Sequence, residues 1–393
     1  MKNMKKIIIV NNNMKVGGVQ KSLCNLLWEL DKAEKYDVTL LLFSPVGDYM
    51  EHLPPRVRCI TAKSLFRYLG VSQGEMRGMD RLKRGFLAAT CRVFGRSAAI
   101  RMMRWSQKKL PETYDCAISF LHNGRNKLFF GGVQDFVLHC INAKRKITFL
   151  HDDYVKCGAN HELNRKIMQE FDAIAACSDG CRRVFETVVP ELAYKSVTVR
   201  NCNNIEEIRS MANENSVVYD ASRINVVCAA RLSPRKGVDR AIEAASLMIQ
   251  QGIPMTLHIL GSGVEEARLK QMVIDRHLEK EVIFYGEQGN PYRYMKNADL
   301  FLLTSYHEAA PMVIDESYIL SVPVLATRTN SSDEMITERA CGWVCENDQQ
   351  ALNQMLFDVL KDGEILRQKK QELHTHVIDN SRAMSQFFSL IES

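Results

Sequence analysis

Short apolar runs alternate with segments of helical period along the whole chain, and this alternation restricts the fold more than any other feature of the sequence. Each run is bounded by turn or polar residues, which is typical of buried strands. Strands that alternate with helices predict a parallel α/β architecture. We expect strands at Lys6–Val10, Val38–Phe43, Cys116–Phe120, Ile147–Leu150, Ala173–Cys177 and Val197–Val199, and in a second set at Ile224–Cys228, Thr256–Leu260, Val282–Tyr285, Leu300–Leu303, Pro323–Ala326 and Gly342–Cys345.

The two sets of strands predict two domains. A chain of 393 residues is too long for one ordinary core. The segment 201–223 between the sets is rich in Asn, Ser and charge, so we place a linker there. We expect an N-terminal Rossmann-like domain over 1–205, a C-terminal one over 206–375, and a helix over 376–393 that returns to the first domain. Two doubly wound domains would bring their βα loops to one shared central cleft.

The cysteines and the apolar runs indicate the compartment. Twelve cysteines are scattered without repeated spacing, which favours buried thiols in a reducing compartment over a disulfide framework or a zinc site at Cys177 and Cys181. Ile7–Val10 is too short for a signal peptide, and no run approaches the roughly 20 apolar residues of a membrane-spanning helix. We therefore expect a cytoplasmic protein.

Two loops after expected strands suit phosphate groups. Arg231 and Lys236 follow the strand that ends at Cys228 and precede a helical segment, whose N-terminus favours anions. Gly261-Ser262-Gly263 follows the next strand, and its missing side chains would let a nucleotide approach the backbone. A solvated loop and a plain turn are the alternative interpretations.

A pair of glutamates flanks the start of another expected helix. Glu308 precedes Pro311, which suits a first helical turn, and Glu316 lies inside the helix. A carboxylate can hold both hydroxyls of a ribose, and Glu316 is placed for that, whereas Glu308 could bind hydroxyls of a donor sugar. The alternative is an acidic residue favoured by the helix dipole together with a surface glutamate.

Together these pieces resemble the retaining glycosyltransferases of family four, which have the GT-B fold. The resemblance covers nearly all of the C-terminal half and thinly the N-terminal half. It lies in residues that recur in order: Gly17-Gly18, Arg231 with Lys236-Gly237, Gly261-Ser262-Gly263, Gly286, Ala298-Asp299, Glu308 with Glu316, and Pro323-Val324 with Glu334.

The resemblance implies a role for each site residue. It assigns Glu308 to the donor sugar, Glu316 to the ribose, and Arg231 and Lys236 to the diphosphate. His151 matches a histidine near the donor sugar, although His-Asp at a strand end is also a common turn. The remaining expected contacts to the nucleotide-sugar are Gly17, Gly18, Gly261, Gly263, Gly286, Ala310, Met312 and Val313. We expect Glu308, His151, Arg231 and Lys236 to be the catalytic residues.

One position departs from the family pattern. The family commonly has Gly directly after the first glutamate, where this chain has Ala309. Alanine keeps the N–H group but tolerates positive φ poorly, so donor geometry could differ. The resemblance also implies retention of the anomeric configuration. Because Arg231 and Lys236 can stabilise the leaving diphosphate, we expect no metal, and Asp152-Asp153 is the nearest candidate for one.

Charge is concentrated in one segment of the N-terminal half. Residues 56–109 contain fourteen Lys or Arg against Glu75 and Asp80, about +12 in a chain of net charge +6. Aromatic and aliphatic residues lie among these cations, which indicates attraction to an anionic membrane. An amphipathic helical pair with a solvated basic face is the alternative, and no RNA-binding module supports a nucleic-acid partner.

The expected activity is that of a bacterial hexosyltransferase, peripheral at the inner face of the cell membrane. It would move a sugar from a nucleotide-sugar, with uridine as the expected base, to a lipid-linked saccharide in capsule, lipopolysaccharide or related polysaccharide biosynthesis. We expect no cofactor beyond the donor. The alternatives are a catalytically weak accessory subunit, hinted at by Ala309, a nucleotide-sugar epimerase, or a phosphorylase, for which we find no cofactor lysine.

Overall fold

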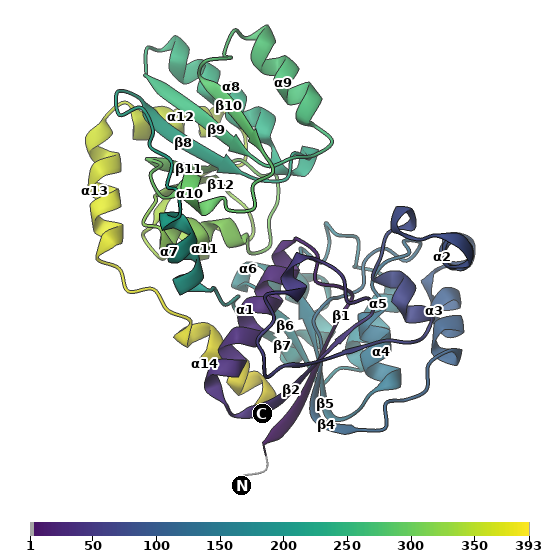
Figure 1. Ribbon diagram of the computed structural model, residues 1–393. Helices are drawn as coiled ribbons and strands as arrows, with labels where there is room; N and C mark the ends of the chain where they lie inside the picture. Colours follow the sequence, from purple (N-terminus) through teal and green to yellow (C-terminus); the bar gives the residue numbers. More distant parts are fainter. Residues whose placement is uncertain (1–3, 393) are drawn as a thin grey trace. The chain divides into compact units, whose positions relative to one another are not determined.

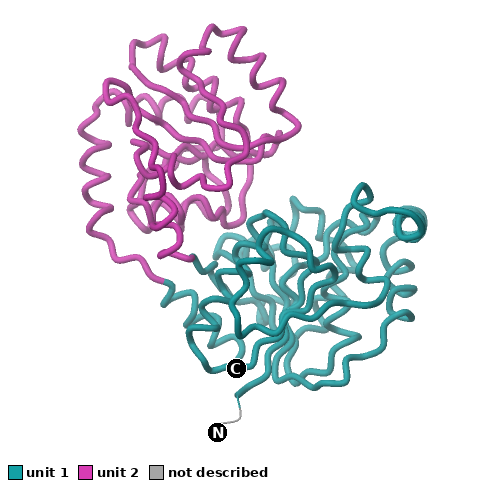
Figure 2. Tube along the Cα trace, in the orientation of Figure 1, with its two compact units in different colours: residues 1–203, 380–393 teal, residues 204–379 magenta. Residues whose placement is uncertain are grey.

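A computed structural model describes residues 4–392, which form two compact units. Among these residues, 4–203 and 380–392 belong to unit 1, and 204–379 belong to unit 2 (Figure 2). The chain passes into unit 2 after residue 203 and back into unit 1 after residue 379, which is two residues before and four residues after the boundaries expected from the sequence. Where the chain passes between the units, the side chain of Asn380 makes two hydrogen bonds to the backbone of Asn203. Its Oδ1 atom accepts from the amide of Asn203 at 2.9 Å, and its Nδ2 atom donates to the carbonyl of Asn203 at 2.8 Å.

Unit 1 is built on a seven-stranded parallel sheet in the order β3-β2-β1-β4-β5-β6-β7. Helices cover both faces: α1 and α14 pack on one, and α2, α3 and α4 on the other (Figure 1). The strands are β1 (Lys5–Asn11), β2 (Tyr36–Leu42), β3 (Arg58–Thr61), β4 (Thr113–Ser119), β5 (Asn142–Leu150), β6 (Ala173–Ala176) and β7 (Ser196–Thr198). The helices are α1 (Gly18–Ala33), α2 (Gly78–Phe94), α3 (Arg96–Trp105), α4 (Val133–Cys140), α5 (Glu162–Gln169), α6 (Asp179–Val188) and α14 (Ser381–Glu392).

Unit 2 has a six-stranded parallel sheet in the order β10-β9-β8-β11-β12-β13. Helices α8, α9 and α12 cover one face, and α7, α10 and α11 cover the other, while α13 contributes Leu366 to the first core and Leu373 to the second. The strands are β8 (Ile224–Ala229), β9 (Met255–Leu260), β10 (Val282–Gly286), β11 (Leu300–Leu303), β12 (Val324–Thr327) and β13 (Gly342–Cys345). The helices are α7 (Ile205–Asn213), α8 (Val238–Gln250), α9 (Glu266–Asp275), α10 (Tyr292–Met295), α11 (Met312–Ile319), α12 (Gln349–Leu360) and α13 (Gly363–His374).

The predicted parallel α/β fold is confirmed, and every expected strand is present within a few residues of its predicted bounds. Central strands of a parallel sheet are buried on both faces, so they read as continuous apolar runs. Strand β3 was not predicted. It lies at the edge of the sheet with largely exposed residues, and it has no apolar run for that reason.

Two segments differ from the prediction. The expected linker 201–223 contains helix α7, which is capped by Asn204 and buries Ile208 and Ala212. The expected terminal helix over 376–393 is shorter than predicted, because α14 begins only at Ser381, and helix α13, which ends at His374, was not predicted. The sequences of α7 and α13 are mostly polar, and each helix is held by only a few buried residues.

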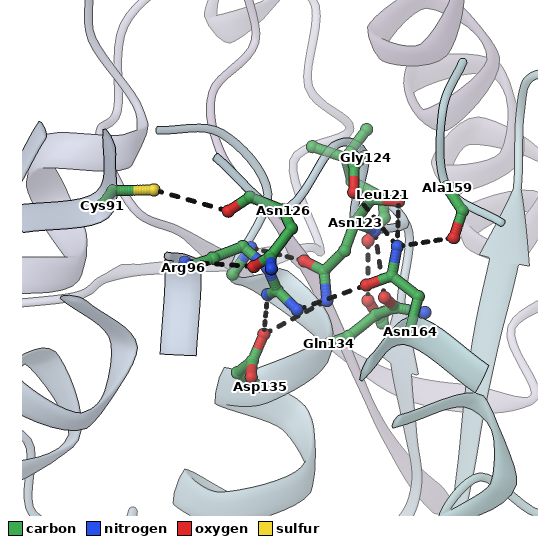
Figure 3. Close-up of polar contacts among 12 residues, drawn as sticks. Cys91, Arg96, Leu121, Asn123, Gly124, Asn126, Gln134, Asp135, Ala159 and Asn164 are labelled. Atoms are coloured by element: carbon green, nitrogen blue, oxygen red, sulfur yellow. Dashed lines mark hydrogen bonds and ion pairs between the residues drawn. The ribbon is translucent and has the colours of Figure 1, made fainter. Parts of the chain in front are cut away.

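A buried polar network joins α3 to the rest of unit 1 (Figure 3). Arg96 is only 3% exposed and donates to Asp135 on α4 at 2.5 Å and to Asn164 on α5 at 3.3 Å. Asn123, in the loop after β4, also donates to Asp135, at 3.2 Å. Arg96 therefore belongs to the interior, and our assignment of this residue to a membrane-attracted surface is wrong.

None of the helices in residues 4–392 combines the length and the apolar character needed to cross a membrane.

Candidate active site

The candidate site of unit 2 lies where the strand order of the sheet reverses. From the adjacent strands β8 and β11 the chain proceeds outward in opposite directions, to β9 and β10 on one side and to β12 and β13 on the other. In open α/β sheets, ligands bind beyond the carboxyl ends of the strands at such a switch point. Lys236 follows β8 and Glu308 follows β11, so both loops lie at this point.

Lys236 and Glu308 are in direct contact at the switch point. The Nζ atom of Lys236 donates to Oε1 of Glu308 at 2.6 Å, and the hydroxyl of Ser305 donates to the same oxygen at 2.7 Å. The Glu308 side chain is 6% exposed and that of Lys236 27%. The structure thus brings together a cation and a carboxylate that the sequence separates by 72 positions.

The two loops are held against each other by backbone contacts. Gly237 adopts φ +59°, and a Cβ there would come within 2.3 Å of the carbonyl oxygen of Thr304. The hydroxyl of Thr304 donates to the carbonyl of Gly237 at 2.7 Å. Only glycine fits this close approach, which fixes Lys236 beside the loop that carries Glu308.

The loop after β11 is also braced from β13. The side-chain amide of Asn347 donates to the carbonyls of Tyr306 and Arg328, and it accepts from the buried Arg240 at 2.6 Å. The guanidinium of Arg240 stacks over the ring of Tyr306. Glu308 is therefore presented by a loop with little freedom to move.

Glu316 lies on α11, about one turn beyond the loop. Its side chain is buried, and Oε1 accepts a hydrogen bond of 3.4 Å from the hydroxyl of Tyr292 on α10. The first-turn amides of α11, those of Met312 and Val313, have no acceptor within the helix, as at any helix start. The helix dipole makes this end favourable for an anion, and Ala310 lies just before the N-cap, Pro311.

Ala309 occupies its place without backbone strain. It is not among the five non-glycine residues of positive φ in the described part of the chain, which are Glu34, Asn215, His277, Ser321 and Ala340. The side chain is buried. The conformation that would have demanded glycine is absent at this position, so the alanine does not distort the loop.

The glycines of the loop after β9 have a packing reason. A Cβ on Gly261 would lie 1.9 Å from the carbonyl oxygen of Ala230, and one on Gly263 would lie 2.2 Å from that of Leu232. These glycines let the loops after β8 and β9 lie side by side. Gly286, at φ +69°, has open space where its Cβ would be.

Arg231 differs from the other predicted phosphate ligands. Its side chain is exposed, and it has neither a hydrogen bond nor an ion pair within residues 4–392. Its loop is held by the backbone instead, with Leu232 donating to the carbonyl of Ser262 at 2.8 Å. The guanidinium is therefore available to a ligand rather than committed to the fold.

In unit 1, Gly17 and Gly18 form the start of α1 after β1. A Cβ on Gly18 would meet nothing within 4 Å, and one on Gly17 would meet closely only the flexible end of Gln20. Packing within unit 1 therefore requires neither glycine. The bare backbone leaves the helix N-terminus open to a ligand.

His151 follows β5 and is held between aromatic rings. Its ring centroid lies 4.6 Å from that of Phe120 and 5.6 Å from that of Phe149. Burial, with a smaller effect from His122, lowers the pKa of His151 to about 3, so the imidazole is neutral at neutral pH. Its Nε2 atom is buried and has no hydrogen-bond partner in the described part of the chain.

Three polar residues around these groups were not predicted from the sequence. Ser305 bonds Glu308, Tyr292 bonds Glu316, and His122 accepts from the backbone of His151 at 3.5 Å. His122 and Ser305 each follow a strand closely, at the edge where ligands are expected, and that position was the available signal. Tyr292 comes from a distant segment and carries no local signal.

The candidate metal position is a turn. The carboxylate of Asp153 accepts from the backbone amides of Val155 and Lys156, both at 2.9 Å, and so closes the loop after β5.

The C-terminal half of the chain is similar to known proteins. Residues 213–383 match the model of the family "Glycosyl transferases group 1". The chain is 33% identical over 150 residues to the amylovoran biosynthesis glycosyltransferase AmsK of Erwinia amylovora. These residues cover 36% of this chain and 37% of that protein. The matched part thus spans little more than a third of that relative.

A second relative is the N-acetylgalactosamine-N,N'-diacetylbacillosaminyl-diphospho-undecaprenol 4-alpha-N-acetylgalactosaminyltransferase of Campylobacter jejuni. It is 29% identical over 123 residues, which cover 31% of this chain and 34% of that protein. Among solved structures, Alr3699/HepE of Anabaena in complex with UDP and glucose superposes with a TM-score of 0.66 at 18% identity, over 99% of this chain and 100% of the other. Residues 213–383 are therefore similar to the glycosyl transferases group 1 family, and the chain as a whole has the GT-B fold.

Proposed function

We propose that the protein is a retaining, metal-independent hexosyltransferase that moves a sugar from UDP to a lipid-linked saccharide in the biosynthesis of a bacterial surface polysaccharide. The observation that supports this most directly is the contact of Lys236 with Glu308 at the β8–β11 switch point. A fixed cation beside a fixed carboxylate matches a donor whose diphosphate is negative and whose sugar offers hydroxyl groups.

The departing diphosphate is the chemical problem that this site addresses. Negative charge grows on it as the anomeric C–O bond breaks, and donors already aimed at that charge lower the barrier. Lys236, Arg231 and the first-turn amides of α11 are such donors. Because these groups are fixed or uncommitted cations and dipoles, they supply the stabilisation for which other transferases use a divalent ion.

The two glutamates divide the recognition of the donor. Glu316, buried and oriented by Tyr292, accepts hydrogen bonds from the two ribose hydroxyls. Glu308, oriented by Ser305, accepts from hydroxyls of the sugar. The diphosphate takes over Lys236 when the donor binds, which leaves Glu308 free to turn to the sugar.

Unit 1, taken by itself, has groups that suit parts of a nucleotide-sugar. Gly17 and Gly18 offer backbone amides to phosphate oxygens, since packing needs neither glycine. His151 offers its unsatisfied Nε2 atom to a sugar hydroxyl. A neutral imidazole can donate or accept there, and the low pKa keeps it neutral throughout the physiological range.

The choice of donor and acceptor draws on the relatives. Alr3699/HepE was solved with UDP and glucose, which supports a uridine donor. The Campylobacter jejuni relative acts on a saccharide joined to diphospho-undecaprenol, and the Erwinia amylovora relative serves amylovoran biosynthesis. The first supports a lipid-linked acceptor, and the second supports a place in polysaccharide biosynthesis.

A nucleotide screen followed by a transfer assay tests the proposal. UDP or a UDP-sugar should raise the unfolding temperature more than GDP, ADP or their sugars, because a ligand that binds only the native state stabilises it. The preferred donor, labelled in its sugar, should then label a lipid extract of bacterial membranes with retained anomeric configuration, also in the presence of a metal chelator. Interconversion of the free nucleotide-sugar without transfer would favour an epimerase instead. Binding with neither reaction would favour an accessory subunit.

A further inference from the structure

The fourteen cations of residues 56–109 fall into two groups. Five have partners inside unit 1: Arg56 with Asp31 and Glu34, Arg58 with Glu112, Arg67 with Asp80, Arg84 with Val71 and Gln73, and Arg96 with Asp135. The other nine have neither an ion pair nor a side-chain hydrogen bond within residues 4–392, and all nine are exposed. We call these the free cations: Lys63, Arg77, Arg81, Lys83, Arg92, Arg101, Arg104, Lys108 and Lys109.

The two acidic residues of the segment do not offset the free cations. Asp80 is paired with Arg67, and Glu75 is paired with Lys15. The charge that the sequence distributes over the whole segment is therefore concentrated, in the structure, on the exposed surface of α2 and α3 and the residues that follow α3. Figure 1 shows these two helices beside each other at the rim of unit 1.

Helix α2 also presents apolar side chains to solvent. Met79, Leu82, Phe86 and Val93 are between 61% and 67% exposed. Their spacing of three, four and seven residues places all four on one side of the helix. Leu87 and Cys91, which are buried, lie on the opposite side and pack into unit 1. Phe94, the last residue of α2, and Trp105, at the end of α3, are 75% and 82% exposed.

Exposed cations lie to either side of this stripe. With about 100° between successive residues, Lys83 lies about 70° from the middle of the stripe, and Arg92 and Arg81 lie about 110° and about 130° from it in the other direction. We call the stripe and these three cations the docking face. A helix with bulky apolar residues between basic ones is the pattern that lies in a lipid headgroup region, apolar side inward.

A second copy of the chain does not suit this face. In a symmetric dimer, the same patch of each copy contacts the other, so the free cations would face like charges. Anionic headgroups instead complement every one of them. The exposed bulky residues would at the same time leave water for the acyl boundary.

We infer that the docking face of α2 binds the surface of an anionic phospholipid bilayer, with Phe86 at its centre inserted below the headgroups. This extends the proposed function, since a lipid-linked acceptor requires the enzyme to work at a membrane. It also divides the basic segment: the free cations attract the bilayer, whereas the paired cations hold unit 1 together.

Vesicle sedimentation of the full chain tests the inference. The protein should sediment with vesicles of phosphatidylcholine and phosphatidylglycerol at low salt, and not with phosphatidylcholine alone. Arg81→Gln with Arg92→Gln should weaken the partition into the mixed vesicles by about thirtyfold, since each surface cation contributes about fivefold. Phe86→Ser should weaken it roughly tenfold, because one aromatic ring no longer leaves water.

Matched controls separate the face from net charge. Arg56→Gln with Arg58→Gln removes the same charge from paired positions, and Tyr194→Ser removes an aromatic ring that is exposed elsewhere in unit 1. Both variants should sediment like the parent protein. Equal loss in both arginine pairs, an unchanged Phe86 variant, or no sedimentation of the parent would each overturn the inference.

Nucleotide binding distinguishes this failure from failure of the proposed function. UDP affinity, measured without vesicles, should be the same in the docking-face variants as in the parent. A variant that no longer binds vesicles but keeps its affinity for UDP has lost only the function of the docking face. A parent protein that sediments but binds no nucleotide would contradict the proposed function and leave the docking face supported.

Discussion

Arg96 and Asp135 form an ion pair in the interior of unit 1, with 2.5 Å between Nη1 and Oδ2 and side chains that are 3% and 9% exposed. Arg96 begins α3 and Asp135 lies in the first turn of α4. Removing either partner of a buried ion pair leaves the other charge buried and unpaired, which lowers the stability of the fold strongly. It fixes the start of α3 to the helix behind it.

The first prediction concerns this pair. Asp135→Ala should destabilise the protein by about 3–5 kcal/mol, because the Arg96 charge is left buried without its partner. Chemical unfolding followed by circular dichroism measures the loss. Glu162→Ala, which removes an exposed partner of Lys166 in the same unit, is the control and should change stability little. Equal effects of the two substitutions would contradict the assignment.

The second prediction concerns the ribose. Glu316→Ala should weaken UDP binding by about 10–100-fold, the loss expected for hydrogen bonds to a charged acceptor. Titration calorimetry measures the affinity. Glu279→Ala, at an exposed position of unit 2, should bind UDP like the parent. An unchanged affinity in the Glu316 variant, with the unfolding temperature unaltered, would remove the ribose assignment.

The third prediction concerns acid. Burial lowers the pKa of His151 to about 3 and that of His258 to about 4, below the usual value of 6.5. The unfolded chain takes up protons near pH 6.5, whereas the folded chain does so only at these lower values. Stability is therefore full above pH 6.5 and falls as the pH drops toward 4, by up to about 1.4 kcal/mol per unit for each histidine.

Urea unfolding across this range measures the slope. His258→Gln should flatten the acid loss, whereas His374→Gln, at an exposed site, should leave it unchanged. A parent protein whose stability rises on acidification through this range would refute the prediction.

The fourth prediction compares two glycines. Gly261 and Gly286 both have positive φ, at +130° and +69°, but only Gly261 has a carbonyl in the way of a Cβ. Gly286→Ala should cost about 1–2 kcal/mol from backbone strain alone. Gly261→Ala should cost clearly more, since the loop after β8 must also move. Thermal unfolding of the two variants, side by side, checks the order.

Much of the fold could be predicted because the central strands of a parallel sheet are buried on both faces, and Leu300–Leu303, which is fully buried, has the same bounds in the sequence interpretation and in the structure. Strand Gly342–Cys345 also has the same bounds, although it lies at an edge of its sheet and is only partly buried. Edge strand β3 and helix α7 were not found, because partial exposure replaces an apolar run with a few isolated contacts. For α7, Asn204 with Glu207 three residues later was an available start signal.

The site was predictable residue by residue but not in its contacts. Lys236 and Glu308 could be named from their loops, whereas their pairing depends on the adjacency of β8 and β11, which is a property of sheet topology. For the basic segment 56–109, the charge could be predicted from the sequence, but not which cations are exposed. Composition counts all fourteen cations alike, and only the fold reveals that Arg96 is internal and Arg81 is not.

Helix α14 has a consequence for biosynthesis. Met384, Phe387 and Ile391 belong to the same core as β1 and α1, yet they are made after the whole of unit 2. When synthesis has reached residue 379, α14 is not yet made, so the apolar face of unit 1 that α14 covers is still exposed. Unit 2 can mature as a nested module during translation, whereas unit 1 remains open to chaperones and to aggregation until its final turns emerge from the ribosome.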